Sequence, residues 1–158
     1  MTILDAVVVG AGPAGASCAL WLHRLGARVL VLDGAPQVGG LLASSRFPNE
    51  WNVSLGSAAT GQQCARDMAQ ALDRNSVPVE LGRMVTLRSV CDGVIATDRR
   101  DAWAVRARYA VIATGNRPVD GGLASNDQVH IGLASFATVA ATTVEGKDIA
   151  VLGGGDTA

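Results

Sequence analysis

The sequence predicts an α/β fold built on a parallel sheet, with a β-meander and the beginning of a second unit of the same kind. Three observations lead to this prediction. An apolar run, closely spaced glycines and a helical stretch follow one another within residues 3–32, short strand-like runs fill residues 84–113, and the opening pattern returns after residue 147. The 158 residues, 49% of them hydrophobic, are enough for a domain with a core. A net charge of −1 gives no indication of a nucleic-acid partner.

The first unit is predicted to be β–α–β. An apolar run over residues 3–9 indicates a strand, residues 13–25 indicate a helix, and residues 28–32 indicate a second strand. Gly26 is well placed to end the helix. A crossover of this kind makes the two strands parallel neighbours.

The turn between the first strand and the helix carries glycines at G-x-G-x-x-G spacing. Gly10 lets the chain turn sharply, Gly12 lets a pyrophosphate approach the backbone, and Gly15 lets the helix pack closely on the strand. Pro13 suits the first helical turn, and the amide groups around Ala14 face the anion with the positive end of the helix dipole. The pattern predicts a dinucleotide site, the alternative being a glycine-rich turn that binds nothing.

Asp33 supports the first of these interpretations. It ends the second strand, 18 residues after Gly15, where a carboxylate is expected to accept hydrogen bonds from ribose hydroxyls. Residues 34–54 are predicted to be a functional loop, in which Gly39 and Gly40 offer another close backbone approach. Asn49 offers an amide side chain to a ligand, although ordinary turn chemistry explains it as well.

The rest of the chain is predicted from periodicity. Residues 57–74 indicate a helix with apolar side chains three and four positions apart. Strands are expected at residues 77–81, 84–90, 94–97, 103–106, 109–113 and 147–152, of which the middle ones form the meander.

A second copy of the opening turn closes the chain. Gly153, Gly155 and Ala158 stand at G-x-G-x-x-A spacing after the strand expected at residues 147–152. The helix that such a turn needs for an anion site is not in the sequence, so we expect this chain to be the N-terminal part of a longer protein. Residues 1–117 are predicted to form the first domain, and residues 118–158 a linker and the beginning of a second.

Two such turns with Ala113-Thr114-Gly115 between them resemble the two-dinucleotide-binding flavoproteins, and above all the thioredoxin reductase-like family. The resemblance rests on Gly10–Gly15, Asp33 (usually a glutamate in that family), Gly39-Gly40, Ser44-Ser45-Arg46 before Asn49, Gly61-Gln62, Ala113–Gly115, and Gly146-Lys147 leading into Gly153–Ala158. It implies a Rossmann-like FAD-binding domain followed by a Rossmann-like NAD(P)-binding domain. It also implies an FAD-dependent oxidoreductase that transfers hydride between NAD(P)H and flavin.

The resemblance assigns roles to the predicted site residues. It places the FAD pyrophosphate on the first turn and the adenosine ribose on Asp33. It places Gly39, Gly40 and Asn49 along the flavin, and has Thr114 and Gly115 close the FAD site. The NAD(P)H site would begin at Gly153, Gly155 and Ala158. A homodimer is a further implication of the family.

Two departures from the family pattern bear on function. Leu41 replaces a glutamine after the glycine pair, and the family's redox cysteine pair falls on Phe136-Ala137-Thr138-Val139. Without a dithiol, electrons cannot pass by thiol exchange to a protein disulfide. We therefore expect another electron acceptor, a small molecule or a redox protein, as in the cysteine-free relatives that include ferredoxin reductases.

Two other functions stay open: a flavin monooxygenase-type enzyme, or a truncated FAD- or nucleotide-binding module without activity. The residues predict no catalytic acid, base or nucleophile and no metal site, since Cys18, Cys64 and Cys91 lie far apart. The uncharged run at residues 6–22 contains the turn glycines and fits neither a signal peptide nor a membrane span. We expect a cytoplasmic protein with buried thiols, and a 158-residue chain that by itself is inactive and binds FAD weakly or not at all.

Overall fold

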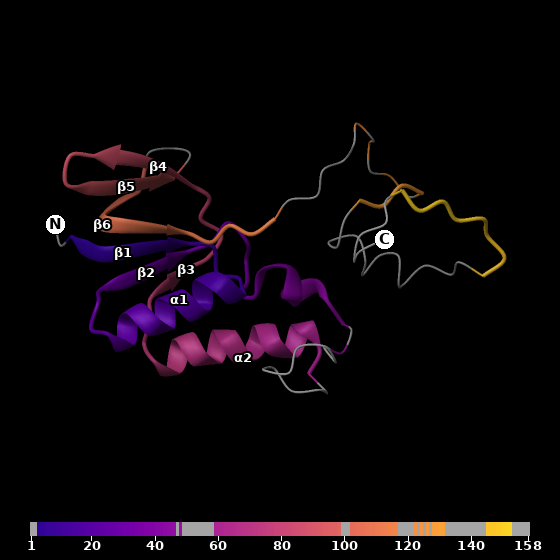
Figure 1. The fold of residues 1–158 in the computed structure, drawn as a ribbon, viewed down its shortest axis with the longest axis horizontal. Helices are drawn as coiled ribbons and strands as arrows, with labels where there is room; N and C mark the ends of the chain where they lie inside the picture. Colours follow the sequence, from indigo (N-terminus) through magenta and orange to yellow (C-terminus); the bar gives the residue numbers. More distant parts are fainter. Residues whose placement is uncertain are drawn as a thin grey trace.

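The computed structural model describes residues 3–46, 48, 59–98, 102–116, 122, 124, 126, 128–131 and 145–152 (Figure 1). The elements in chain order are β1 (Leu4–Val9), α1 (Pro13–Arg24), β2 (Val29–Leu32), the 3-10 helix η1 (Gly40–Ser44), α2 (Gly61–Arg74), β3 (Val79–Glu80), β4 (Val85–Val90), β5 (Gly93–Asp98) and β6 (Ala104–Ile112).

The strands form one six-stranded sheet in the order β3-β2-β1-β6-β5-β4. β1 is parallel to β2 on one side and to β6 on the other, and β2 is parallel to β3. The β4–β5 and β5–β6 pairs are antiparallel and form the meander. This architecture confirms the predicted fold class, a Rossmann-like α/β unit with a parallel sheet and a meander.

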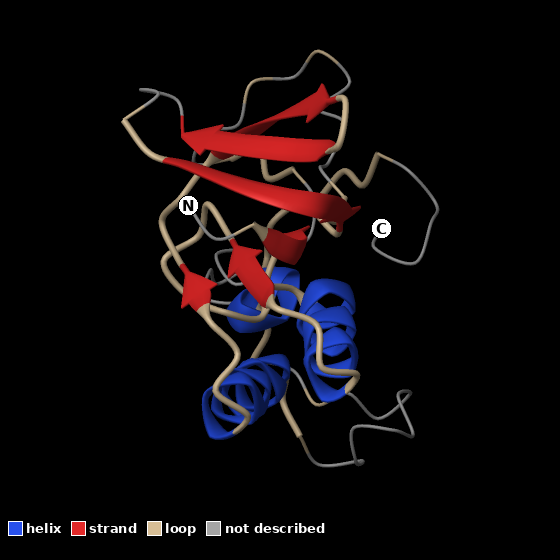
Figure 2. Cartoon of the chain, turned by 90° about the vertical axis from the view of Figure 1, so that its left-hand side faces the viewer, coloured by secondary structure: helices blue, strands red, loops and turns tan. Residues whose placement is uncertain are grey.

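The core lies on both faces of this sheet. On one face α1 and α2 cover β1 and β2, so that Val8, Val31 and Leu72 are buried together (Figure 2). On the other face Val7 and Leu32 pack against Val94 and Ala96 of the meander. Because successive strand residues point to opposite faces, the unbroken apolar run of β1 serves both cores.

β6 corrects one prediction. The sequence indicated two strands, at residues 103–106 and 109–113, whereas the structure has a single nine-residue strand. Ala107 pairs with Val94 of the meander on one side and with Leu4 of β1 on the other. The strand therefore runs unbroken from the meander into the parallel sheet, and the exposed Arg108 interrupts only the apolar pattern.

The helices differ from the predictions at their ends. α2 begins at Gly61, because Thr60 is its N-cap and accepts a hydrogen bond from the Gln63 amide at 3.2 Å. The predicted residues 57 and 58 lie outside the described residues. α1 ends at Arg24, one residue early, and η1 lies within the segment that was predicted to be loop.

The strand predicted at residues 147–152 is wrong. These residues are exposed and form no strand, and no described strand pairs with them. An extended segment needs a hydrogen-bonded neighbour to become part of a sheet, and none of the described residues supplies one.

Two further observations concern the described residues alone. No helix among them is both long and apolar enough to cross a membrane, and no group of His, Cys, Asp or Glu within these ranges could hold a metal ion. The expectation of buried thiols holds for Cys64 only, since Cys18 is half-buried and Cys91 is exposed.

Candidate nucleotide-binding site

The first glycine turn is shaped by two glycines that the fold itself requires. Gly10 has φ +110°, and a Cβ there would lie 2.1 Å from the Ala113 carbonyl oxygen. A Cβ on Gly15 would lie 1.9 Å from the Gly10 carbonyl oxygen. The Gly10 amide donates to the Leu32 carbonyl at 2.7 Å and ties the turn to the end of β2. These glycines let β1, β6 and α1 approach one another closely.

Gly12 is different, because the fold makes no such demand on it. Its φ of −72° and ψ of −177° are open to any residue. A Cβ there would meet only the Gly40 Cα, at an ordinary contact distance of 3.8 Å. Among the described residues, Gly12 therefore has room for at least a Cβ, and such room lets a ligand approach the backbone.

The start of α1 supplies hydrogen-bond donors to that room. The Ala16 amide donates to the Gly12 carbonyl at 2.9 Å, and Pro13 has no N–H to donate. Among the described residues no acceptor is found for the amides of Gly12, Ala14 and Gly15. Free amides and the positive dipole end of a helix form an anion site. The geometry of the turn thus fits a pyrophosphate.

Asp33 lies directly against this turn. Its Oδ2 accepts a hydrogen bond from the Ala11 amide at 2.6 Å, and its Oδ1 accepts one from the Ala35 amide at 2.8 Å. Its backbone is held as well, since its amide donates to the Glu80 carbonyl and its carbonyl accepts from the Arg83 amide. The carboxylate is consequently fixed at the edge of the turn.

The glycine pair of the following loop also reaches the turn. The Gly39 amide donates to the Ala11 carbonyl at 2.9 Å, and Gly39 has φ +117°. A Cβ on Gly39 would lie 2.3 Å from the Ala65 Cβ, and one on Gly40 would lie 3.2 Å from the Gly12 Cα. Gly39 therefore packs against α2, and Gly40 lies beside Gly12.

The end of β6 lies on the opposite side of the same turn. The Ala113 amide donates to the Val9 carbonyl at 2.8 Å, and the Ala113 carbonyl faces Gly10. The exposed Thr114 and Gly115 follow at once. The first turn, Asp33 and the Ala-Thr-Gly segment thus lie together at the carboxyl ends of the parallel strands β1, β2 and β6, with the glycine pair beside them.

The remaining predicted residues cannot be placed. Asn49, Gly153, Gly155, Ala158 and the segment 136–139 lie outside the described residues. Sequence reasoning missed the part that Ala11 and Ala35 take, because both act through backbone amides that no residue type reveals.

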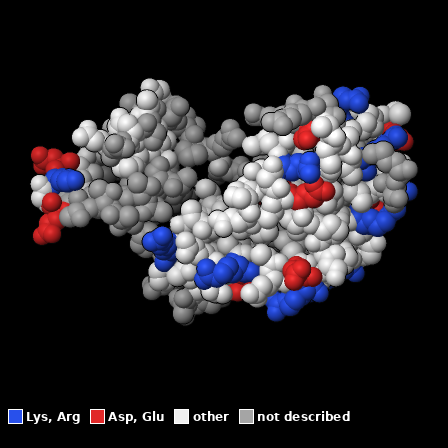
Figure 3. Space-filling view, turned by 180° about the vertical axis from the view of Figure 1, so that it is seen from behind, with Lys and Arg blue, Asp and Glu red and all other residues white. Residues whose placement is uncertain are grey.

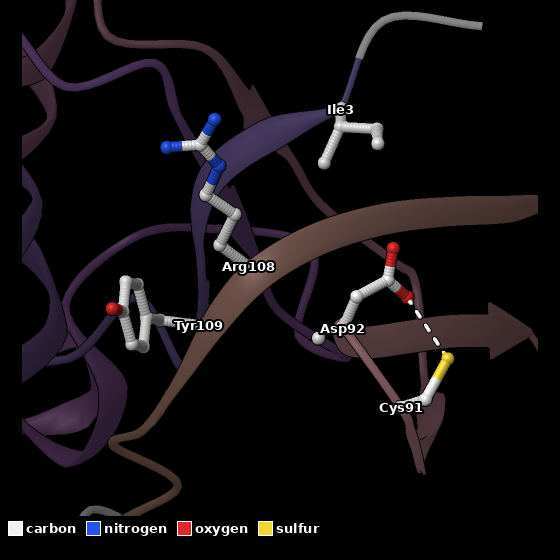
Figure 4. Close-up of a pocket in the computed structure, with 6 residues that line it drawn as sticks. Ile3, Cys91, Asp92, Arg108 and Tyr109 are labelled. Atoms are coloured by element: carbon white, nitrogen blue, oxygen red, sulfur yellow. Dashed lines mark hydrogen bonds between the residues drawn. The ribbon is translucent and has the colours of Figure 1, made fainter.

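A surface pocket of about 430 Å³ lies elsewhere, lined by Ile3, Cys91, Asp92, Gly93, Arg108 and Tyr109 (Figure 4). Within it the Cys91 thiol donates to Asp92 at 3.6 Å. A hydrogen bond from Arg106, outside the pocket lining, lowers the pKa of the Asp92 carboxyl. The pocket is at the start of β1, whereas the glycine turn follows its end, and the side chains of Asp92 and Arg108 are 57% and 66% exposed.

The charged side chains of the described surface indicate no second site. Acidic and basic residues are interspersed on the face seen in Figure 3. Several of them pair: Arg28 with Asp5 at 3.2 Å, Arg83 with Glu80 at 2.6 Å, and Arg106 with Asp92. Arg83 also lies over the Trp103 ring, 4.5 Å from its centroid. The glycine turn is therefore the best-supported ligand site in the described structure.

Known proteins resemble this chain in both sequence and fold. The chain is 30% identical over 165 residues to a thioredoxin reductase of Streptomyces coelicolor, with 99% of the chain and 48% of the relative covered. It is 28% identical over 166 residues to a ferredoxin–NADP reductase of Lactococcus lactis subsp. cremoris, with 100% and 50% covered. The solved thioredoxin reductase of T. acidophilum superposes with a TM-score of 0.67 at 26% identity, over 81% of this chain and 40% of that one.

The chain therefore spans about half the length of the relatives it matches. The model of one protein family, described as pyridine nucleotide-disulphide oxidoreductase, matches residues 4–158. This match confirms the family predicted from the two glycine turns: the chain belongs to the pyridine nucleotide-disulphide oxidoreductase family.

Proposed function

We propose that this chain forms the FAD-binding part, and begins the NAD(P)H-binding part, of a flavin-dependent NAD(P)H oxidoreductase. The observation that carries the proposal is the room for a Cβ at Gly12, beside the free amides of Gly12, Ala14 and Gly15. A glycine at a position where a Cβ has room suits the close approach of a ligand to the backbone.

Different residues of this site would hold different parts of FAD. The start of α1 from Pro13 would bind the pyrophosphate, and Asp33 would face the adenosine ribose. Gly39, Gly40 and Asn49 would lie along the flavin, while Thr114 and Gly115 would close the site. Gly153, Gly155 and Ala158 would begin the NAD(P)H site. Hydride exchange with a nicotinamide is the chemistry that the flavin supplies when bound, so the chain itself needs to contribute little acid–base chemistry.

The cysteines bear on the electron acceptor. Cys18, Cys64 and Cys91 form no C-x-x-C pair, so this chain offers no dithiol relay to a protein disulfide. A small molecule or a redox protein would take the electrons instead, and a relative named ferredoxin–NADP reductase supports the redox protein. A cytoplasmic location, a homodimer and a domain boundary near residue 117 stay predictions.

The whole protein that contains this chain tests the proposal directly. Purified, it should be yellow, with flavin absorption that is bleached by NADPH or NADH in the absence of oxygen. A colourless protein that takes up no added FAD, or a yellow one that neither nucleotide bleaches, would contradict the proposal.

A single methyl group tests the site. In the whole protein, Gly12→Ala should weaken FAD binding by about tenfold or more, because a misplaced methyl in a packed site costs about 1–3 kcal/mol. The thermal midpoint of the FAD-free protein should fall only slightly, since the added Cβ has room and alanine is only a poorer N-cap of α1 than glycine. Ser17→Ala, an exposed change on the same helix, is the matched control. Unchanged FAD affinity in Gly12→Ala would refute the assignment of the turn.

A further inference from the structure

We infer that Asp33 is a positioning residue that braces the glycine turn, and that it assists nucleotide binding even where it touches no ribose. This inference rests on the proposed function of the turn as a nucleotide site. It differs from the role predicted from the sequence, in which Asp33 acts only on the ribose hydroxyls.

The hydrogen bonds of the carboxylate carry the inference. Both oxygens accept backbone amides: Oδ2 that of Ala11 at 2.6 Å, and Oδ1 that of Ala35 at 2.8 Å. Hydrogen bonds to an ionised carboxylate are roughly twice as strong as neutral ones. Ala11 and Ala35 belong to different segments, so one side chain joins the glycine turn to the loop that follows β2.

The Ala11 residue is held from two sides. Its amide donates to Asp33, while its carbonyl accepts the Gly39 amide at 2.9 Å. Its side chain is fully buried. The Asp33 bond holds the peptide unit between Gly10 and Ala11, and the Gly39 bond holds the unit between Ala11 and Gly12, whose orientation decides where the Gly12 amide points.

These bonds matter because Gly12 has no side chain to restrain its backbone, although its carbonyl accepts the Ala16 amide at 2.9 Å. A glycine left free samples many backbone conformations, and ordering it on binding costs affinity. By fixing Ala11, the residue before Gly12, Asp33 and Gly39 together lower that cost in the folded protein before a ligand arrives. The Ala11 amide is thereby used by the protein, and the amides of Gly12, Ala14 and Gly15 are left for the anion.

A pair of ligands separates the brace from a ribose contact. ADP carries both ribose hydroxyls of interest, and 2′,3′-dideoxy-ADP lacks them. Affinities of the 158-residue chain for both are measured by NMR titration, for the native protein and for Asp33→Asn. Asparagine keeps the shape of aspartate, but it loses the charge and turns its NH₂ group toward one of the two amides.

If Asp33 braces the turn, Asp33→Asn should weaken both ligands, each by about tenfold, the effect of a lost charge-assisted hydrogen bond. A larger loss for ADP would add a ribose contact to the brace. Loss of ADP affinity with unchanged dideoxy-ADP affinity would overturn the inference. Asp5→Asn is the matched control, because Asp5 also accepts a backbone amide, that of Arg28 at 2.9 Å, and lies at the far end of β1. It should change neither affinity.

A second measurement needs no ligand. In the native chain the Ala11 amide should exchange slowly with solvent, because it is buried and donates to Asp33. In Asp33→Asn its exchange should quicken, while Asp5→Asn should behave as the native chain. An Ala11 amide that behaves alike in all three would overturn the brace. If neither nucleotide binds the 158-residue chain, the two affinities are measured on the whole protein freed of FAD, and the Ala11 amide decides the brace in either case.

Discussion

The chain contains one local sequence pattern twice, and the two copies differ in structure. Asp5-Ala6-Val7-Val8-Val9-Gly10 and Asp148-Ile149-Ala150-Val151-Leu152-Gly153 both run from an aspartate through four apolar residues to a glycine. The first copy is strand β1, at the centre of the sheet (Figure 1). Residues 148–152 of the second are exposed and form no strand, with Ile149, Val151 and Leu152 at 63%, 61% and 82% exposure.

The difference shows that an apolar run only favours a strand. Whether the strand forms depends on neighbouring strands that pair with the run and on elements that bury its side chains. β1 has β2 along one edge and β6 along the other, and helices and meander above and below it. In the described part of the chain, no strand pairs with residues 148–152, and neither core cluster includes them. β-propensity measures how well a residue fits a half-buried, paired surface.

The largest expected effect tests how tightly the first copy is packed. Gly15→Ala should lower the free energy of unfolding by about 3 kcal/mol or more, because its Cβ would meet the Gly10 carbonyl at 1.9 Å and neither backbone can yield. Urea unfolding followed by circular dichroism measures the change. Gly12→Ala is the control in the same turn and should stay near the native value. Equal stability of the two variants would mean that α1 does not approach β1 as closely as the structure has it.

The next effect compares the two copies at matched positions. Val8 and Val151 each lie two residues before the glycine, and Val8 is fully buried whereas Val151 is 61% exposed. Val8→Ala should cost about 2 kcal/mol through lost burial and the cavity that is left. Val151→Ala should change stability by less than about 0.5 kcal/mol, as for other surface changes. A comparable loss from both variants would show that residues 148–152 are buried in solution.

The sequence predicted best what short-range signals determine. The first β–α–β unit and its glycine turn were right because periodicity, Gly26 and the glycine spacing lie within thirty-odd residues. The joined strand β6 was missed because Ala107 is placed by Leu4 of β1, far away in sequence, as well as by Val94 of the preceding strand β5. The strand at 147–152 was wrong for the converse reason, an apolar pattern without partners.

The candidate site divides in the same way. The residue types at Gly10, Gly12, Gly15 and Asp33 were enough to predict a site at the end of β1. They could not reveal which glycine the fold requires and which is open, because that depends on atoms of Ala113 and Gly40. Nor could they reveal that Asp33 holds the Ala11 amide, since backbone donors carry no signature in the sequence.

The smallest expected effect is on the pH dependence of stability, and it compares Asp5 and Asp148, the aspartates at which the two copies begin. The backbone amide of Arg28 and then its guanidinium donate to Asp5, and these bonds lower the pKa of that carboxyl below its ordinary value. A carboxyl whose pKa is lower in the folded chain than in the unfolded one adds stability above the unfolded pKa. That stability is lost as the pH falls from about 4 through the folded value. Asp5→Asn should therefore be less stable than the native chain at neutral pH, and the difference should shrink towards about pH 3.

Urea midpoints measured across this range check the prediction, with Asp148→Asn as the matched control. Asp148 is exposed, so its variant should follow the native chain at every pH. The effect of Asp5 should be small, because the Arg28 side chain is 53% exposed and solvent screens the pair. A gap between Asp5→Asn and the native chain that stays constant down to about pH 3 would show that the Asp5 charge does not support the fold. The asparagine would then destabilise because its NH₂ group cannot accept a hydrogen bond, and the contrast between the copies would rest entirely on the burial of their apolar side chains.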